Sequence, residues 1–323
     1  MSDKLALVFP GQGSQYVGMG LDLYEQYPAA RAVYDQADQV LGMALSALCF
    51  EGPESDLNDT INTQVAVLST SLATLEAMGG VERIEDIGLV AGHSLGEYTA
   101  LVAAGAISLV EALQLVRERG RLMKEAGDRR PGGMAAVLGL PSEVVSQACD
   151  QAYQDTGAIV QVANYNLPEQ IVISGEHQGL QRASEIVKEK GARRVVNLAV
   201  SIASHSPLME SAAEGLKHAL EKVTLSSSRI PVIGNVSALP LTEAREIGDE
   251  LVRQLVSPVQ WVDSVRFMLH QGVSTFVEVG PKDVLTKLIT RIAGETRAVS
   301  INDAAAVEGW RSAALQGADA AEA

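Results

Sequence analysis

A pattern of glycines around one serine constrains this 323-residue chain more than any other feature of its sequence. The residues Gly92-His93-Ser94-Leu95-Gly96 follow a short apolar run, Ile87–Ala91, and open a helical pattern, Gly96–Ala104. A sharp turn between a strand and a helix needs glycines, because the neighbouring backbone leaves no room for side chains. Such a turn exposes the serine oxygen at the carboxyl end of the sheet. The pattern favours Ser94 as a nucleophile, with the Leu95 amide as an oxyanion donor, over a chance Gly-Ser turn.

Short apolar runs alternate with longer helical patterns along the rest of the chain. A strand is expected at Leu5–Phe9, and helices are expected from Leu21 to about Leu48 and at Gln64–Met78. Later strands, separated by helical segments, are expected at Pro231–Gly234, Thr275–Val279 and Ala298–Ile301. This alternation predicts an α/β fold.

The middle of the chain has a different order of elements. After a glycine-rich break, Gly127–Gly133, the patterns predict a strand at Met134–Leu140 and a helix from about Pro141. Two strands, Ile159–Asn164 and Gln170–Ser174, follow, and then a helix, Gln178–Lys190, and a strand, Arg193–Leu198. This β-α-β-β-α-β order is ferredoxin-like. We therefore predict one α/β domain, residues 1–130 and 207–323, interrupted by a small inserted domain, residues 131–206. Residues 316–323 lack apolar periodicity and are expected to form a frayed tail.

The net charge of −15 argues against some classes of partner. Nucleic acids and anionic membrane surfaces both select for a surplus of Lys and Arg, which this chain lacks. The two cysteines, Cys49 and Cys149, have no metal-ligand spacing and are expected to be reduced thiols. The start of the chain does not have the pattern of a signal peptide, and the most apolar stretch, Leu101–Val110, is too short to span a bilayer. We expect a cytoplasmic protein with no metal site.

A glycine-rich loop, Phe9–Gln15, follows the first strand and suits a second oxyanion donor. Its backbone can approach a ligand closely, because Gly11 and Gly13 carry no side chains. A dinucleotide-binding motif is the competing interpretation, but its third glycine is replaced by Tyr16, and the Gly-Lys-Ser/Thr of a phosphate-binding P-loop is also missing. Both phosphate-binding interpretations are therefore poor.

An arginine lies in the apolar stripe of a predicted helix, Ser108–Ala126, which begins with a capping box of Ser108 and Glu111. At about 100° per residue, the neighbours of Arg119 on this helix are apolar: Ala112, Leu115, Val116, Leu122 and Met123. An unpaired charge facing the core is very costly, so Arg119 must meet an internal carboxylate or the anionic end of a ligand. Beside an acyl-transfer serine, the second alternative implies an acyl group that carries its own carboxylate.

A serine nucleophile needs a base, and the chain has five histidines. His205 lies in an irregular stretch, 201–207, where the inserted domain rejoins the main one, and clefts between domains are common places for sites. His205 is therefore the predicted base. His93 is expected to line the substrate site, whereas three histidines are expected to be exposed or packing residues: His177, His218 and His270. No Asp or Glu lies in the stretch around His205, so a backbone carbonyl or an amide side chain is expected to orient it.

Taken together, these motifs resemble the malonyl-CoA:acyl-carrier-protein transacylases of fatty-acid synthesis. The resemblance covers residues from about 4 to 302, with the motifs in the right order and spacing: Phe9–Gln15, Gly92–Tyr98, the helix of Arg119, Ser204-His205 and Ser257–Trp261. It implies an α/β-hydrolase-like core with a ferredoxin-like insert, in agreement with the element order.

The resemblance also implies a ping-pong acyl transfer. Ser94 would take malonyl from coenzyme A, and His205 would act first as a base and then as an acid. The amides of Gln12 and Leu95 would form the oxyanion hole, and Arg119 would hold the malonyl carboxylate.

Further implications concern the histidine and the partners. The backbone carbonyl of Gln260 would orient His205. Coenzyme A thioester would be a substrate, with no permanently bound cofactor, and the acceptor would be the phosphopantetheine thiol of acyl carrier protein. We expect a monomer.

Three alternatives remain open at this stage. Related acyltransferases of polyketide synthesis share most of these motifs, and some load methylmalonyl. A serine hydrolase would use the same turn with water as the acceptor, and a scaffold with a dead site would only bind carrier protein.

Carrier proteins of this kind are acidic, by family resemblance, and so is this chain. Attraction between the two must therefore be local. We predict a basic rim around the site, made of Arg117, Arg121, Lys124, Arg129 and Arg130 and, on the insert, of Lys188, Lys190, Arg193 and Arg194.

Overall fold

The computed structural model describes residues 4–198, 200 and 202–321, and its core is a six-stranded sheet. The strand order is β10-β9-β1-β2-β7-β8, and all neighbours are parallel except β7 and β8. The strands are β1 (Lys4–Phe9), β2 (Ile87–Gly92), β7 (Val232–Ile233), β8 (Pro240–Leu241), β9 (Val273–Val279) and β10 (Arg297–Ile301). Each strand predicted for this part of the chain overlaps an observed one, and the predicted α/β class is confirmed.

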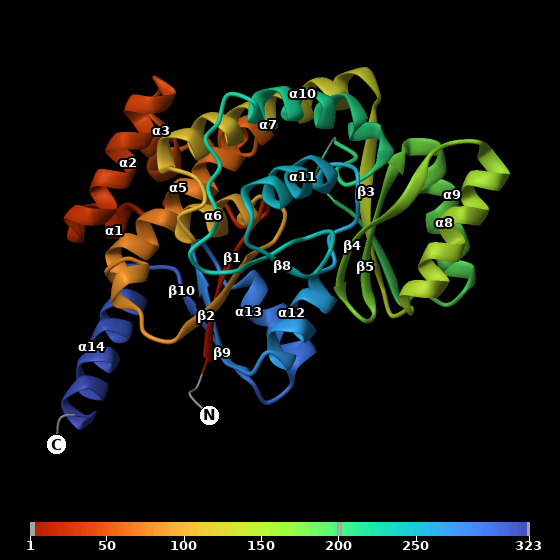
Figure 1. Ribbon diagram of the computed structural model, residues 1–323. Coiled ribbons are helices and arrows are strands. Elements are labelled where there is room, and N and C mark those ends of the chain that lie inside the picture. The colour runs from red at the N-terminus through yellow and green to blue at the C-terminus, as the bar shows by residue number, and fades with distance from the viewer. Residues whose placement is uncertain (1–3, 199, 201, 322–323) are drawn as a thin grey trace.

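Helices cover both faces of this sheet (Figure 1). Because side chains alternate along a strand, Leu5, Leu7 and Phe9 of β1 pack into one apolar cluster and Ala6 and Val8 into another. The first cluster lies under α5 (Thr60–Met78), α6 (Gly96–Ala103), α7 (Leu109–Arg129), α10 (Glu210–Leu220) and α11 (Ala244–Gln254). The second lies under α12 (Trp261–His270) and α13 (Val284–Ala293).

The single long helix predicted from Leu21 to about Leu48 is wrong. The chain forms three helices there: α1 (Leu21–Gln26), α2 (Pro28–Leu41) and α3 (Leu45–Glu51). Proline has no amide hydrogen to continue a preceding helix, so Pro28 begins a new one, and Gly42 ends it in the left-handed region at φ 61°.

Two other helix boundaries also differ from the prediction. The helix predicted at Gln64–Met78 begins earlier, at Thr60, because Asp59 caps it and accepts the Ile61 amide over 3.0 Å. The predicted frayed tail is wrong through residue 321, since α14 (Ala304–Ala321) continues that far, and residues 322–323 lie outside the described chain.

Short helical turns complete the set: α4 (Glu54–Leu57), η1 (Val81–Arg83) and η2 (Pro207–Met209). Across residues 4–198, 200 and 202–321, no helix combines the length and the apolar character that crossing a membrane requires.

A second, smaller sheet lies beside the first and is antiparallel, with the order β4-β5-β3-β6. Its elements are β3 (Gly132–Leu138), α8 (Ser142–Thr156), β4 (Val160–Leu167), β5 (Gln170–Glu176), α9 (His177–Glu189) and β6 (Arg194–Asn197). Figure 1 shows α8 and α9 together at the outer side of this sheet, and both pack into its separate apolar cluster. The element order is the predicted one, whereas the domain boundaries at 130/131 and 206/207 stay predictions.

A short backbone bridge joins the smaller sheet to the segment before α12. The Tyr165 amide of β4 donates to the Val259 carbonyl, and the Val259 amide donates to the Ala163 carbonyl, both over 2.9 Å. This bridge fixes the segment before α12 against the smaller sheet.

Candidate active site

The turn that carries Ser94 lies between β2 and α6, as predicted, and its glycines are sterically required. A Cβ on Gly92 would lie 1.9 Å from the Gly96 backbone, and a Cβ on Gly96 would lie 2.0 Å from the Phe9 carbonyl oxygen. Ser94 itself adopts φ 51°, in the left-handed region. This turn therefore stores strain at the predicted nucleophile.

Ser94 and His205 are in direct contact, although 111 residues separate them. The distance from Ser94 Oγ to His205 Nε2 is 2.9 Å, and His205 Nδ1 lies 2.7 Å from the Gln254 carbonyl oxygen. Because a carbonyl only accepts, Nδ1 carries the proton and Nε2 is free to take one from the serine. Burial, and then the Arg119 charge, lower the pKa of His205 to about 3. His205 is therefore neutral, the form that a base requires.

The prediction that the Gln260 carbonyl orients His205 is wrong, because the Gln254 carbonyl takes that place. Gln260 lies at the N-terminus of α12, and its carbonyl accepts both the amide and the hydroxyl of Ser264, over 2.9 and 3.0 Å. The first turn of α12 thus uses the carbonyl that the resemblance had assigned to His205.

The backbone amides of Gln12 and Leu95 lie on the cavity wall and have no acceptor within residues 4–198, 200 and 202–321. Leu95 stands at the start of α6, and Gln12 lies in the loop after β1. Two hydrogen bonds hold the loop that carries Gln12. Gln12 Oε1 accepts from the Thr60 hydroxyl over 3.0 Å, and Lys282 Nζ donates to the Gly13 carbonyl over 3.0 Å. Unpaired amides beside a nucleophile suit the binding of an oxyanion.

Arg119 is buried, with 1% of its surface exposed, and all its hydrogen-bond partners are neutral. Nη1 donates to Gln64 Oε1 over 2.6 Å, and Nη2 donates to Gln254 Oε1 over 2.9 Å and to Ser94 Oγ over 3.2 Å. Nε has no partner in the described part of the chain, and no carboxylate there lies within 4.0 Å of the guanidinium. The sequence left two partners open for Arg119, an internal carboxylate and the anionic end of a ligand. Within the described residues, no internal carboxylate pairs with Arg119.

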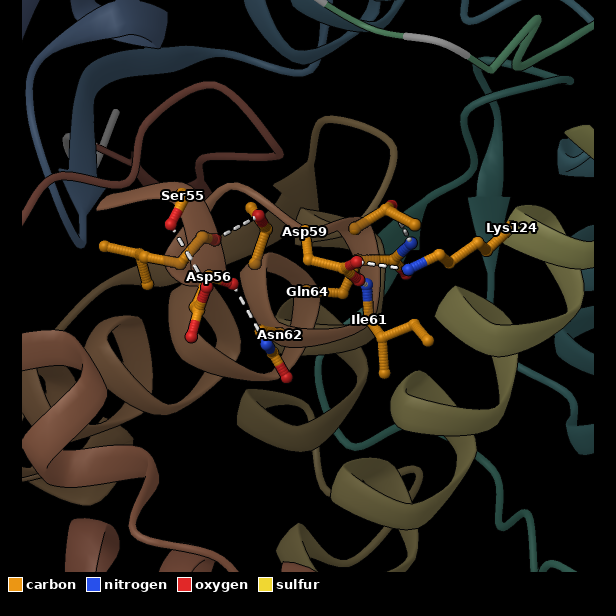
Figure 2. Close-up of polar contacts among 10 residues, drawn as sticks. Ser55, Asp56, Asp59, Ile61, Asn62, Gln64 and Lys124 are labelled. Atoms are coloured by element: carbon orange, nitrogen blue, oxygen red, sulfur yellow. Dashed lines mark hydrogen bonds and ion pairs between the residues drawn. The ribbon is translucent and has the colours of Figure 1, made fainter. Parts of the chain in front are cut away.

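An ion pair between α7 and the residue before α5 lines one side of the cavity. Figure 2 shows Lys124 reaching from α7 to Asp59, with Gln64 nearby on α5. Lys124 lies just over one helical turn beyond Arg119 on α7. The two side chains connect α7 to the α5 region at two places, through Lys124 with Asp59 and through Arg119 with Gln64. Because Gln64 is itself buried on α5, these two ties hold Arg119 in one orientation.

Gln254 contacts three site residues and is held by a buried carboxyl. Its Nε2 donates to the Ser94 carbonyl over 3.0 Å and to Glu97, while its Oε1 accepts from Arg119. Burial raises the pKa of Glu97 well above its ordinary value, and the neighbouring Glu250 raises it further. This shift favours the neutral form of Glu97, which does not neutralise the Arg119 charge.

His93 lines the cavity, as predicted, and does not contact Ser94 Oγ through any described hydrogen bond. Its Nε2 lies 2.8 Å from Asn166 Oδ1, and its ring lies 5.6 Å from the Trp261 ring. Burial lowers the pKa of His93, so it too is neutral. The three other histidines, His177, His218 and His270, are exposed, as predicted.

The cavity has a volume of about 380 Å³ and lies between the two sheets. The larger sheet and its helices contribute the charged and nucleophilic groups. The chain after the smaller sheet contributes Ser204 and His205. The other side chains from this side are apolar or amide: Met134, Asn164, Asn166, Val172, Leu198, Val200 and Ile202. No group of three metal-ligating side chains occurs in the described residues.

Sequence reasoning missed the amide side chains that hold this site: Gln64, Asn166, Asn235 and Gln254. For Gln254 a signal exists, because it follows Ile247 and Leu251 on the apolar stripe of α11. A buried polar group on such a stripe needs a partner, which is the argument that identified Arg119.

Comparison with known proteins gives one consistent family. The model of the acyl transferase domain matches residues 6–314. The malonyl CoA-acyl carrier protein transacylase of Bacillus subtilis is 45% identical over 305 residues, 94% of this chain and 95% of the relative. The crystal structure of an acyl carrier protein S-malonyltransferase from Vibrio cholerae matches with a TM-score of 0.91 and 42% identity, over 95% of this chain and 99% of that chain. A malonyl-transacylase solved with a type II PKS acyl-carrier protein matches with a TM-score of 0.90 and 40% identity, over 96% and 100%. The chain thus belongs to the family of malonyl CoA-acyl carrier protein transacylases.

Proposed function

We propose that this protein transfers malonyl from malonyl-CoA to the phosphopantetheine thiol of acyl carrier protein through an ester on Ser94. The observation that carries the proposal is the state of Arg119. A buried guanidinium, hydrogen-bonded only to neutral groups in the described chain, lies 3.2 Å from the Ser94 oxygen. Its uncompensated charge suits an acyl group that ends in a carboxylate.

In the first half of the reaction, Ser94 Oγ attacks the thioester carbonyl and His205 Nε2 takes the serine proton. The negative oxygen that develops is stabilised by the amides of Gln12 and Leu95. The tetrahedral intermediate then expels the coenzyme A sulfur, which takes the proton back from His205. Malonyl-Ser94 and free coenzyme A result.

In the second half, the thiol of the carrier protein replaces coenzyme A. His205 takes the thiol proton, the sulfur attacks the Ser94 ester, and the proton returns to Ser94 Oγ as the ester breaks. Throughout both halves, Arg119 holds the far carboxylate, and His93 lines the space between. Coenzyme A enters and leaves as a substrate, and neither half of the reaction calls for a bound cofactor.

Mass spectrometry of the intact protein tests this function directly. After incubation with malonyl-CoA we expect one malonyl adduct, absent in Ser94→Ala and removed by added carrier protein, which gains the mass. Rapid appearance of free malonate without an adduct would indicate a hydrolase, and no adduct at all would indicate a binding scaffold.

The same experiment with methylmalonyl-CoA and acetyl-CoA defines the acyl group. One methyl group changes binding by about 1–3 kcal/mol, so methylmalonyl is expected to load more slowly than malonyl rather than not at all. Equal loading of malonyl and acetyl would contradict the role of Arg119.

We also propose that carrier protein docks on the predicted basic rim, with the insert carrying most of its free charge. On α7 and at the residue that follows it, ion pairs occupy four of the predicted cations: Arg121, Lys124, Arg129 and Arg130. Arg117 donates to the Leu41 carbonyl over 2.5 Å. The insert cations are exposed and have no ion pair within the described residues: Lys188, Lys190, Arg193 and Arg194.

A groove supports this placement. A hollow of about 600 Å³ between α9 and β6 is lined by Lys188 and shares Met134, Leu198 and Val200 with the catalytic cavity. A partner seated on the insert would therefore lie next to the entrance of the site.

Charge reversal tests the docking surface. Lys188→Glu with Arg194→Glu should slow malonyl transfer to carrier protein at low salt and leave loading from malonyl-CoA unchanged. Arg121→Glu, at a cation already paired, is the matched control and should change transfer less. Equal transfer by the insert variant and the parent would refute docking there.

A further inference from the structure

The turn that carries Ser94 is held from behind by the side chain of Asn235. Asn235 follows β7 and is 2% exposed. Its Nδ2 donates to the Gly92 carbonyl and its Oδ1 accepts the Ser94 amide, each over 2.7 Å. These two hydrogen bonds fix the turn on both sides of His93.

The second of these bonds acts where the backbone is strained. Ser94 adopts φ 51°, which a residue with a side chain occupies only when its surroundings hold it there. The same conformation places Ser94 Oγ 2.9 Å from His205 Nε2 and leaves the Leu95 amide unpaired among the described residues. Both the nucleophile and one oxyanion donor therefore depend on the torsion that Asn235 restrains.

Asn235 is itself anchored by other elements. Its amide donates to Glu97 of α6 over 3.4 Å, and its carbonyl accepts the Gln260 amide over 2.7 Å. The next amide, of Val236, donates to Glu250 of α11 over 2.6 Å. With its backbone fixed on these sides, the Asn235 side chain meets the turn in one orientation.

We propose that Asn235 is a positioning residue that holds the Ser94 turn in its reactive conformation. It touches neither substrate nor reacting atoms, so it acts through the backbone of Ser94. The inference goes beyond malonyl transfer, because it predicts the reactivity of Ser94 toward any electrophile.

The chemistry of the two bonds makes Asn235→Asp a decisive variant. A carboxylate can accept the Ser94 amide but cannot donate to the Gly92 carbonyl, whereas the protonated acid can do both. The titratable groups that face residue 235 are Glu97 and Glu250. Two further charged or titratable groups, Arg119 and His205, lie one contact away, because both hydrogen-bond to Gln254. Protonation at low pH should therefore restore the reactivity of this variant.

The experiment measures the rate at which a fluorophosphonate probe labels Ser94 as a function of pH. The serine oxygen forms a bond to phosphorus, fluoride leaves, and His205 takes the proton, so no malonyl group is involved. The ratio of the Asn235→Asp rate to the parent rate should rise as the pH falls. The ratio for Asn62→Asp, a half-buried position on α5 that does not contact the Ser94 turn through any described hydrogen bond, should not change with pH. A pH-independent ratio for Asn235→Asp would overturn the proposal.

Asn235→Leu provides the second measurement, because it removes both bonds at every pH. Labelling should fall by about 10- to 100-fold, the effect of leaving buried polar groups unpaired. The ratio of malonyl to acetyl loading should stay unchanged, since Arg119 keeps its partners. A folded Asn235→Leu protein that labels as fast as the parent would also overturn the proposal, and if this variant does not fold, the pH series decides. Failure of malonyl loading with normal probe labelling would count against the proposed function and not against this inference.

Discussion

Two arginines on the same helix, α7, show how burial decides what a positive charge is used for. Arg119 is 1% exposed and hydrogen-bonds to two amide oxygens and a hydroxyl. Arg121, two residues later, has a side chain that is 45% exposed and pairs with the carboxylates of Glu118 and Glu125. Two residues turn a helix by about 200°, so the two guanidinium groups face opposite environments.

The difference lies in the kind of partner each guanidinium has. The charge of Arg121 is neutralised within the protein and screened by water, so it contributes little to stability or to binding. The charge of Arg119 is solvated by neutral dipoles and keeps its attraction for an anion. A buried cation without a carboxylate partner therefore points to a ligand, whereas an exposed ion pair does not.

Removing the buried charge should have the largest effect. Arg119→Ala should lower malonyl loading of Ser94 by about 100-fold or more, because two charge-assisted hydrogen bonds to the substrate carboxylate are lost. Relative loading of acetyl should rise. Arg119→Lys is the matched control, because it keeps the charge without the planar fork. Unchanged malonyl loading of Arg119→Ala, measured by intact mass, would remove the central argument for this substrate.

Giving Arg119 the kind of partner that Arg121 has should have the next largest effect. Gln64→Glu places a carboxylate at the position that accepts Nη1 over 2.6 Å. The internal ion pair should raise the KM for malonyl-CoA by about 10- to 100-fold.

Acetyl loading controls for damage to the nucleophile in Gln64→Glu. It should stay close to that of the parent, since acetyl does not need the free charge. Gln64→Leu separates the added charge from the lost hydrogen bond, and an equal rise of KM in both variants would argue against charge compensation.

The uncompensated charge of Arg119 should also be visible in the pH dependence. Burial and this charge lower the pKa of His205 from 6.5 to about 3, so the base stays neutral as the pH falls through 6.5. In the parent, the rate of probe labelling of Ser94 should show no fall centred near pH 6.5. Arg119→Gln removes the positive charge and should raise the pKa of His205, by a smaller amount than the amount by which burial lowers it. An acid limb near 6.5 in the parent would contradict the buried, neutral base.

The same shift has a consequence for stability, with a definite sign. Between pH 6.5 and about 3 the unfolded chain binds a proton at His205 that the folded chain does not. The free energy of unfolding should therefore decrease as the pH falls through this window, by up to about 1.4 kcal/mol per pH unit from this group. Urea unfolding of the parent and His205→Gln at several pH values measures the difference.

Breaking the exposed ion pairs should have the smallest effect. Arg121→Gln should change the free energy of unfolding by less than about 1 kcal/mol and malonyl loading by less than about twofold. Thermal melting and intact mass check both values. If Arg121→Gln lost as much malonyl loading as Arg119→Ala, burial would not explain the difference between the two arginines.

Sequence patterns predicted the groups that carry local signatures. Ser94 stands between glycines that the turn requires, and Arg119 stands among apolar neighbours on one helix. Both signals lie within a few residues, so one chain segment contains the whole argument. The long helix from Leu21 failed for the opposite reason, because the apolar pattern continued across Pro28 and Gly42, whose backbone preferences interrupt it.

The residues that hold the site could not be predicted in the same way. Asn235 reaches the Ser94 turn because β7 pairs with β2, strands about 140 residues apart whose pairing no local pattern encodes. Gln254 ends α11 and Gln260 precedes α12, and only the packing of α11 decides that Gln254 offers its carbonyl to His205. Sequence therefore predicted the reacting groups, and tertiary structure determined their supports.

The left-handed backbone at Ser94 has a practical consequence for engineering. Glycine adopts this conformation without the cost of roughly 1–2 kcal/mol that a residue with a side chain bears there. A directed-evolution screen that selects only for heat tolerance would thus reward Ser94→Gly, a change that removes the nucleophile. Libraries of this enzyme need a turnover assay alongside the melting assay, so that inactive variants are not taken for improved ones.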